Sequence, residues 1–122
     1  FLRACADLIG ENAVCVTGEV SHEEREKLTE EILHKKEKNI LFGTQSIFSE
    51  GISVNTLSCL ILATPVNNEP LLTQLIGRVI RKLEGKGTPV VVDIHLKGNT
   101  ASRQASNRMG FYIKQGWEIK QL

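Results

Sequence analysis

The chain has 122 residues, of which 41% are hydrophobic and 24% are charged, a profile that indicates a globular domain with a single core. Fifteen basic and fourteen acidic residues leave a net charge of +1, which excludes a simple polybasic tail or an acidic disordered segment. No apolar run approaches the roughly 20 residues that a membrane-spanning helix needs, so we expect no membrane as a partner.

The first third of the chain alternates between helical and extended patterns. Residues 1–9 place apolar side chains at helical spacing, and residues 13–17 form a short apolar run typical of a strand. Ser21 and Glu24 have the spacing of a capping box, which predicts a mostly solvated helix over residues 21–36. On the first helix, the side chains that we expect to be buried are Leu2, Cys5, Ala6 and Ile9.

The rest of the chain continues this alternation. Residues 57–63 are almost continuously apolar, as expected of a strand that is covered on both faces of a parallel sheet. Gly116 is the expected C-terminal cap of the last helix. The predicted elements are strands over residues 39–43, 57–63, 89–96 and 117–122, and helices over residues 70–83 and 102–115.

Strands that alternate with helices predict an α/β fold. We expect one parallel sheet with right-handed crossovers and helices on both faces, in a single domain over residues 1–122. The chain does not begin with Met, so we also expect it to be a piece of a longer protein. Cys5, Cys15 and Cys59 are odd in number and lie in apolar stretches, which predicts reduced core thiols in a cytoplasmic protein.

Charges are distributed unevenly along the chain. Residues 1–40 hold nine acids and six bases, whereas residues 71–122 hold three acids and nine bases. A basic second half is suited to a polyanion, although a solvated basic face explains it equally well. The candidates for a nucleic-acid track in the last segment are Arg103, Arg108, Lys114 and Lys120. We expect Tyr112 and Trp117 to pack in the fold rather than to stack on bases.

Several features that suggest a catalytic or metal site fail on their spacing. The Gly-Lys of residues 83–89 lacks the spacing of a phosphate-binding loop, and no helix follows it, so we expect a turn. His22, His34 and His95 have no partner at ligand spacing, and we expect no metal site in this chain. Asp93 and His95 alternate along a buried strand, where a position facing a cleft is one option and a structural role is the one that we expect.

The helix predicted over residues 70–83 carries the most informative pattern. Its broad apolar face consists of Leu72, Leu75, Ile76, Val79, Ile80 and Leu83. On the other side, Gln74, Arg78 and Arg81 stand at positions i, i+4 and i+7 with no acidic residue among them. Two guanidiniums that project in one direction suit a phosphate better than bulk water. From the residues alone, an anion site and an ordinary polar solvent face both stay open.

A second informative segment covers residues 43–54 (GTQSIFSEGISV). It follows a strand at its carboxyl end, where open parallel sheets place their ligands. Thr44 offers a hydroxyl, and Gly51 permits a close approach to the backbone. Because apolar residues are interspersed, we expect a short helical turn here, and a plain strand-to-helix loop is the alternative interpretation.

Both segments match, in order and separation, the motifs of one known family. Residues 44–53 (TQSIFSEGIS) resemble motif V, and residues 74–81 (QLIGRVIR) resemble motif VI, Q-x-x-G-R-x-x-R, of superfamily 2 helicases. Residues 16–18 (VTG) resemble the strand-end T-G that precedes the next helix of that family. Over residues 1–95 the chain therefore resembles the C-terminal RecA-like domain of these enzymes, most of all that of the DEAD/H-related DNA helicases of phage and bacterial branch-migration and restriction systems.

This resemblance implies a role for individual residues. Arg78 and Arg81 are the expected arginine fingers, which reach the γ-phosphate of ATP bound on a partner RecA-like domain. Gln74 is expected to hydrogen-bond the same phosphate or to link the nucleotide to the strand-binding loop. The expected contacts at the nucleotide edge are Glu50, Gly51 and Ser53, and the expected contacts to nucleic-acid phosphates are Thr44, Thr17 and Gly18. Such phosphate contacts carry little base information.

The chain also departs from the family pattern. Ser53 stands where many relatives have Asp, and the strand that normally precedes the first helix is missing. Neither a GxxxxGK[ST] motif nor a DExx box is present. The resemblance therefore implies that ATP and Mg²⁺ are bound mainly by an N-terminal RecA-like domain that this chain lacks.

These observations predict the second motor domain of an ATP-dependent DNA helicase or translocase, inactive as an ATPase when isolated. Its expected partners are the N-terminal RecA-like domain of the same protein and DNA, as a single strand or a branched duplex, with RNA less expected. Two alternatives are a non-catalytic RecA-like module that binds nucleic acid or a partner, and an unrelated nucleotide-binding α/β enzyme domain.

Overall fold

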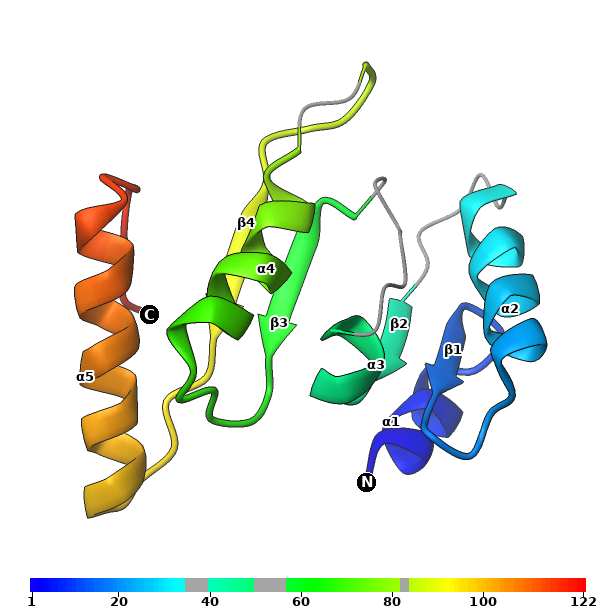
Figure 1. The fold of residues 1–122 in the computed structure, drawn as a ribbon, viewed down its shortest axis with the longest axis horizontal. Helices are drawn as coiled ribbons and strands as arrows, with labels where there is room; N and C mark the ends of the chain where they lie inside the picture. Colours follow the sequence, from blue (N-terminus) through cyan, green and yellow to red (C-terminus); the bar gives the residue numbers. More distant parts are fainter. Residues whose placement is uncertain (35–39, 50–56, 82–83) are drawn as a thin grey trace. The chain divides into compact units, whose positions relative to one another are not determined.

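The described part of the chain forms two compact units, Phe1–Thr56 and Leu57–Leu122, in a computed structural model (Figure 1). The structure describes residues 1–34, 40–49, 57–81 and 84–122. Each unit contains a two-stranded parallel sheet. Parallel pairing and the alternation of helices with strands confirm the predicted α/β fold.

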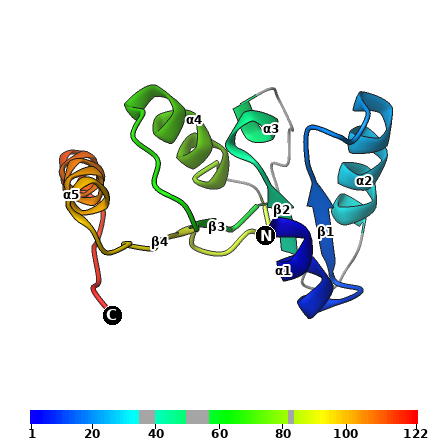
Figure 2. The same ribbon diagram turned by 90° about the horizontal axis from the view of Figure 1, so that it is seen from below.

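The first unit is built around strands β1 and β2. Its elements are α1 (Leu2–Ile9), β1 (Ala13–Val16), α2 (His22–His34), β2 (Ile40–Gly43) and α3 (Gln45–Ser49). The strands run parallel in a register that sets Ala13 opposite Ile40 and Val16 opposite Gly43. In Figure 2, α1 lies on one side of this sheet and α2 and α3 lie on the other.

Local signals in the sequence account for most of this unit. The backbone N–H of Glu24 donates to the Ser21 hydroxyl oxygen at 3.3 Å, as the predicted cap of α2 requires. Ala6 of α1 is buried, as predicted, but Ile9 is exposed although its helical position predicted burial. The difference arises because α1 ends at Ile9, next to Gly10, where the backbone turns away with a φ of 85°.

The second unit places one helix on a sheet and a longer helix beside it. Its elements are β3 (Cys59–Leu62), α4 (Glu69–Val79), β4 (Val90–Asp93) and α5 (Asn99–Lys114). β3 and β4 run parallel in a register that sets Cys59 opposite Val90 and Leu62 opposite Asp93. Helix α4 packs on both strands.

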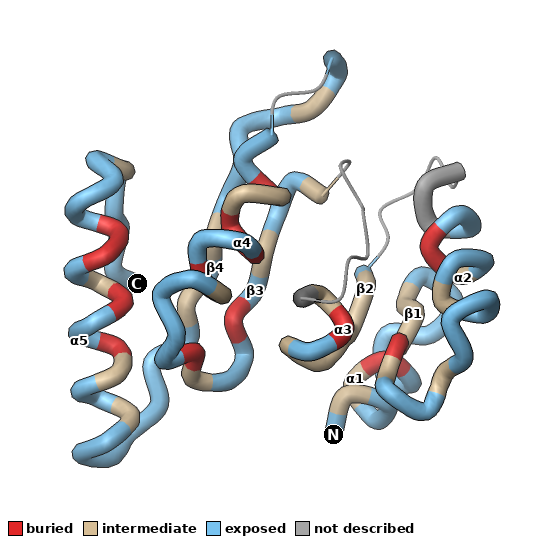
Figure 3. Tube along the Cα trace, viewed as in Figure 1, coloured by how far each residue is buried: buried red, intermediate tan, exposed pale blue. Residues whose placement is uncertain are grey.

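Among the described residues of this unit, α4 packs on one face of the β3–β4 sheet, and Figure 3 shows exposed positions on both strands. Leu62 is buried, but Ile61 is 57% exposed and Val92 is also exposed. The prediction that residues 57–63 are covered on both faces is therefore wrong for this unit, because α4 packs on one face and alternate side chains point to the other. Cys59 is exposed for the same reason, so its predicted core position is also wrong, while all three cysteines are free thiols.

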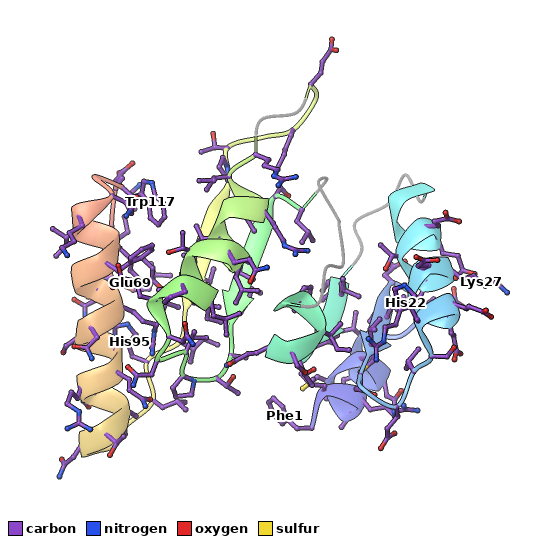
Figure 4. The ribbon with its side chains drawn as sticks, viewed as in Figure 1. Phe1, His22, Lys27, Glu69, His95 and Trp117 are labelled. Atoms are coloured by element: carbon purple, nitrogen blue, oxygen red, sulfur yellow. The ribbon has the colours of Figure 1, made fainter. Side chains whose placement is uncertain are left out.

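The C-terminal segment ends α5 as expected but does not continue as a strand. Gly116 has a φ of 73°, the left-handed conformation that a glycine after a helix supplies. Trp117 then packs against two aromatic rings of α5, near the end of the helix in Figure 4. The centroid of its ring lies 6.0 Å from that of Phe111 and 6.2 Å from that of Tyr112. The strand predicted over residues 117–122 is therefore wrong, because the segment begins by packing onto its own helix.

Among the described residues, no helix has both the length and the hydropathy that crossing a bilayer requires.

Candidate functional site

Helix α4 separates an apolar side from a polar side, as its sequence predicts. Its buried residues are Leu72, Leu75, Ile76 and Val79. On the other side of the helix, Gln74 is exposed and Arg78 is partly exposed. The Asn68 side chain accepts from the backbone N–H of Leu71 at 3.0 Å, and Pro70 lies in the first turn, so the start of the helix is well defined.

The C-terminal end of α4 differs from the prediction. The helix ends at Val79, so Arg81 is exposed and lies just beyond it rather than on the i+7 position of a longer helix. Ile80 is the C-cap, is exposed, and donates its backbone N–H to the carbonyl of Ile76 at 3.0 Å. The predicted burial of Ile80 is therefore wrong, and Leu83 lies outside the described residues.

A lysine from the following turn closes this helix end. The Lys86 ammonium donates to the carbonyl oxygens of Val79 at 2.6 Å and Arg81 at 2.9 Å. Burial lowers the pKa of this ammonium. A cation at this position satisfies carbonyls that the ending helix leaves without partners and favours the negative end of the helix dipole. The turn predicted over residues 83–89 is found at Glu84 and Gly85, among the residues of this segment that the structure describes.

In the first unit, two candidate hydroxyl residues follow the ends of paired strands. Thr17 comes directly after β1 and Thr44 directly after β2, and the residues before them, Val16 and Gly43, are register partners. Neighbouring strands lie about 4.8 Å apart, so both threonines are at the same carboxyl edge of the sheet. Gly18 is exposed beside Thr17.

The hydroxyls of these two threonines have different surroundings. Thr44 Oγ1 lies 3.0 Å from the hydroxyl oxygen of Ser46, at the start of α3. Thr17 Oγ1 is buried and has no hydrogen-bond partner among the described residues. A buried hydroxyl without a partner is unusual in a native fold and is a feature of polar sites.

The remaining predicted nucleotide contacts are not located. Glu50, Gly51 and Ser53 lie outside the described residues. The described candidates belong to separate units: Thr17, Gly18 and Thr44 to the first, and Gln74, Arg78 and Arg81 to the second.

The residue before Thr44 is a glycine, and close packing against it leaves no room for a side chain. A Cβ atom on Gly43 would lie 2.7 Å from Cε2 of the Phe48 ring. Neither Gly43 nor Phe48 is fully exposed, and the neighbouring Ile47 is buried. The glycine therefore lets α3 fold back closely onto the end of β2 and sets the position of Thr44.

We expect Gly43→Ala to destabilise the protein by about 1–3 kcal/mol, because the added methyl group overpacks this contact. Urea unfolding measures the effect. Adding Phe48→Leu removes the ring atoms that the methyl group meets, so the double variant should lose less than the sum of the single losses. Gly18→Ala is the control, because its Cβ would meet nothing within 4 Å. A Gly43→Ala protein as stable as the wild type would contradict this role.

A buried ionic cluster joins α5 to β4. The Arg108 guanidinium donates to both carboxylate oxygens of Asp93, at 2.7 and 2.9 Å, and to the carbonyl of Val66 at 3.3 Å. The Tyr112 hydroxyl donates to Asp93 at 2.7 Å, and His95 Nε2 lies 3.9 Å from the same carboxylate. This geometry confirms a structural role for Asp93 and a packing role for Tyr112. Arg108 is 3% exposed, so its assignment to a nucleic-acid track is wrong.

The cluster changes the titration of its members. Burial alone would raise the pKa of Asp93, but the hydrogen bonds from Arg108 and Tyr112 and the charges of Arg108 and His95 outweigh it and hold that pKa below its ordinary value. Burial, together with the hydrogen bond to Asp93, raises the pKa of Tyr112 well above its ordinary value. The hydrogen bond to Asp93 likewise raises the pKa of Arg108.

The sequence contains a signal for this cluster. Arg108 stands three residues after Ala105 and four before Tyr112, which places a charge on the buried face of α5. Asp93 likewise ends a run of three valines on β4. A charge on an otherwise apolar face of each of two elements predicts that the two charges are paired.

Comparison with known proteins places these features in a family. The model of the helicase conserved C-terminal domain matches residues 1–82. The chain belongs to this family. The match includes the shared edge of β1 and β2 and all of α4, whereas Lys86, β4 and α5 of this helicase C-terminal domain follow it.

Curated relatives agree with the assignment. Over 103 residues, the helicase C-terminal domain is 50% identical to the probable helicase D10 of Escherichia phage T5, covering 84% of this chain and 23% of the phage protein. Over 84 residues it is 31% identical to the putative ATP-dependent RNA helicase L396 of Acanthamoeba polyphaga mimivirus, covering 68% of this chain and 16% of that protein. The chain thus spans less than a quarter of the length of either relative.

A solved structure agrees with the fold. The C-terminal domain of the DEAD-box protein Dbp5 superposes with a TM-score of 0.64 at 19% identity, covering 97% of this chain and 63% of that one. The helicase C-terminal domain therefore has the RecA-like fold. Within its described residues, His, Cys, Asp and Glu side chains form no group of three that could hold a metal ion.

Proposed function

We propose that this domain is the second motor domain of an ATP-dependent superfamily 2 DNA helicase or translocase. In this role it supplies arginine fingers for ATP hydrolysis and contacts to nucleic-acid phosphates. The ATP-binding site itself is assigned to an N-terminal RecA-like domain of the same protein, because no phosphate-binding loop motif is present in this chain.

The observation that carries this proposal is the two-sided construction of α4. Leu72, Leu75 and Ile76 anchor the helix in its own unit, so Gln74 and Arg78 stand on the side away from that core. An ordinary solvated helix face mixes acids with bases, whereas this one carries the Gln74 amide and the Arg78 guanidinium with no acid beside them, and Arg81 adds a second guanidinium just beyond the helix. Guanidiniums present several N–H donors in a planar array that matches phosphate oxygens.

Gly77 supports the same interpretation. A glycine in the interior of a helix costs about 1 kcal/mol relative to alanine. A Cβ at Gly77 would meet nothing within 4 Å, so internal packing does not demand a glycine there. Because glycine has no side chain, the backbone of α4 is uncovered between Gln74 and Arg78. A ligand or a partner domain can therefore approach it closely.

In the proposed mechanism, Arg78 and Arg81 donate hydrogen bonds to the γ-phosphate oxygens of ATP held by the N-terminal domain. Negative charge spreads over these oxygens as the phosphoryl group transfers, and fixed cations stabilise it. Gln74 hydrogen-bonds the same phosphate or links it to the strand-binding loop. The proposed contacts at the edge of the nucleotide are Glu50, Gly51 and Ser53. Mg²⁺ would be held mainly by the N-terminal domain, where it would supply positive charge to the phosphates.

Nucleic-acid contacts are proposed for the β1–β2 edge. Thr17 and Thr44 offer hydroxyls there, and Gly18 offers an exposed backbone. The Thr17 hydroxyl is buried and finds no hydrogen-bond partner in the described ranges, which favours a polar ligand at this edge. Contacts of this kind hold the phosphate backbone without reading bases, which suits an enzyme that tracks along any sequence.

We favour DNA over RNA because residues 74–81 resemble the motif of phage and restriction enzymes. Leu75 and Ile76 are buried, so they make no contact that distinguishes the two nucleic acids, and the preference rests on the resemblance alone. One relative bears the name of an RNA helicase, which keeps RNA as the alternative. The free thiols are compatible with a reducing compartment, and we place the protein in the cytoplasm.

Steady-state ATPase assays of the full-length protein test this proposal. We expect hydrolysis that single-stranded or branched DNA stimulates more than RNA does, and none above background from residues 1–122 alone. Binding of nucleic acid without any turnover in the full-length protein would favour the alternative, a non-catalytic RecA-like module. Turnover by the isolated chain would contradict the assignment of the ATP site to another domain.

A further inference from the structure

The Gly-Lys-Gly turn after α4 has no role in the function proposed above, yet its lysine makes two short contacts. Lys86 donates to the carbonyl oxygens of Val79 and Arg81 at 2.6 and 2.9 Å. One of these residues is the last of helix α4, and the other is a proposed arginine finger. Lys86 itself follows residues 1–82, the part of the chain that the family model matches.

The backbone of the turn is shaped to bring this lysine back to the helix. Gly85 has a φ of 77°, a left-handed conformation that side chains other than glycine rarely adopt. The chain reverses there, and the next residue extends to carbonyls five and seven positions earlier. The Gly-Lys pair lacks the spacing of a phosphate-binding loop, and its ammonium instead donates to two main-chain carbonyls.

Fixing two carbonyls constrains the backbone on both sides of Ile80. Val79 is completely buried, so one carbonyl belongs to a residue that the core already holds. The second carbonyl belongs to Arg81, which lies beyond the last helical turn and is exposed. The Lys86 ammonium makes a charge-assisted hydrogen bond to each of the two carbonyls, and these bonds therefore link the backbone of Arg81 to the rigid end of α4.

We propose that Lys86 is a positioning residue for Arg81: it closes the end of α4 and holds the backbone from which the Arg81 guanidinium projects. This inference rests on the proposed arginine-finger function of Arg81. Catalysis by a positioned group is sensitive to geometry, since a misplacement of about 1 Å can lower a rate by about 10²-fold. Lys86 would thus affect phosphoryl transfer without touching ATP.

The test uses Lys86→Met in the full-length protein, with Lys97→Met as the matched control. Methionine keeps the length of the side chain and removes the donors, and Lys97 is an exposed lysine of the same unit. We expect kcat to fall about 10- to 100-fold with KM for ATP nearly unchanged, because only the transition-state contact is displaced. Lys86→Arg, which retains donors for both carbonyls, should keep most of the rate, and Lys97→Met should match the wild type.

Hydrogen exchange supplies a readout that does not depend on activity. In Lys86→Met, amides over residues 76–81 should exchange faster than in the wild type, since the last turn of α4 loses its closing contact. The Ile80 amide, which donates to Ile76, reports directly on this turn. A fall in kcat without faster exchange in this segment would overturn the inference.

Combining substitutions separates failure of this inference from failure of the proposed function. In an Arg81→Lys background, Lys86→Met should reduce kcat by a much smaller factor than in the wild type, because the two residues act as one unit. The same factor in both backgrounds, or no effect of Lys86→Met in the wild type, would overturn the positioning role while leaving the arginine finger intact. Full activity of Arg81→Lys and of Arg81→Ala would instead remove the arginine-finger function.

Discussion

Arg81→Ala in the full-length protein is expected to lower the ATPase rate by about 10³- to 10⁵-fold, which in most assays is a complete loss. A guanidinium that meets the γ-phosphate stabilises charge that develops only as the phosphoryl group leaves. The loss should therefore fall on kcat, whereas ATP bound by the N-terminal domain should retain most of its affinity. Single-turnover hydrolysis and equilibrium binding of a fluorescent nucleotide measure the two quantities separately.

Arg3→Ala is a suitable control for this experiment. Arg3 is an exposed arginine of α1, so its truncation removes a guanidinium from the surface and leaves every residue of α4 unchanged. The control should hydrolyse ATP at the wild-type rate. Arg81→Ala at the wild-type rate would remove the arginine-finger role, and a loss of ATP affinity equal to the loss of kcat would indicate ground-state binding instead.

The buried side of α4 could be predicted from the sequence because it depends on local periodicity. Leu72, Leu75, Ile76 and Val79 recur at helical spacing, and all four are buried. The end of the same helix could not be predicted in this way. It depends on Lys86, which returns through a glycine turn to meet the carbonyls of Val79 and Arg81, and no pattern within α4 encodes that contact.

The second unit illustrates the same limit for side chains. The spacing of Arg108 within α5 places it on the buried face, but no pattern within that helix identifies the group that neutralises it, and the predicted nucleic-acid contact is wrong for this reason. Its partner Asp93 is 15 residues away on another element. Trp117 likewise does not form the predicted strand, because its ring packs on the aromatic rings of Phe111 and Tyr112 in the preceding helix.

Arg108→Met is expected to destabilise the attachment of α5 by about 3–5 kcal/mol, the range for removing one partner of a buried ion pair. The Asp93 carboxylate, 9% exposed, would lose its bidentate partner and retain the Tyr112 hydroxyl and the more distant His95. Hydrogen exchange of α5 amides in the full-length protein measures the effect locally. Arg103→Met, at an exposed arginine of the same helix, should change little.

A second substitution tests whether the uncompensated charge is the cause. Asp93→Asn added to Arg108→Met removes the orphaned carboxylate, so the double variant should be more stable than Arg108→Met alone. The wild type should also lose stability in acid. The pKa of Asp93 is lowered in the folded state, so its contribution is complete above the unfolded value of about 4 and is lost as the pH falls through the folded value. Because Arg108 supplies the largest of the effects that lower this pKa, the Arg108→Met protein should show a weaker acid dependence in the same window, and an unchanged acid profile would contradict the assignment of this carboxylate as the anchor of α5.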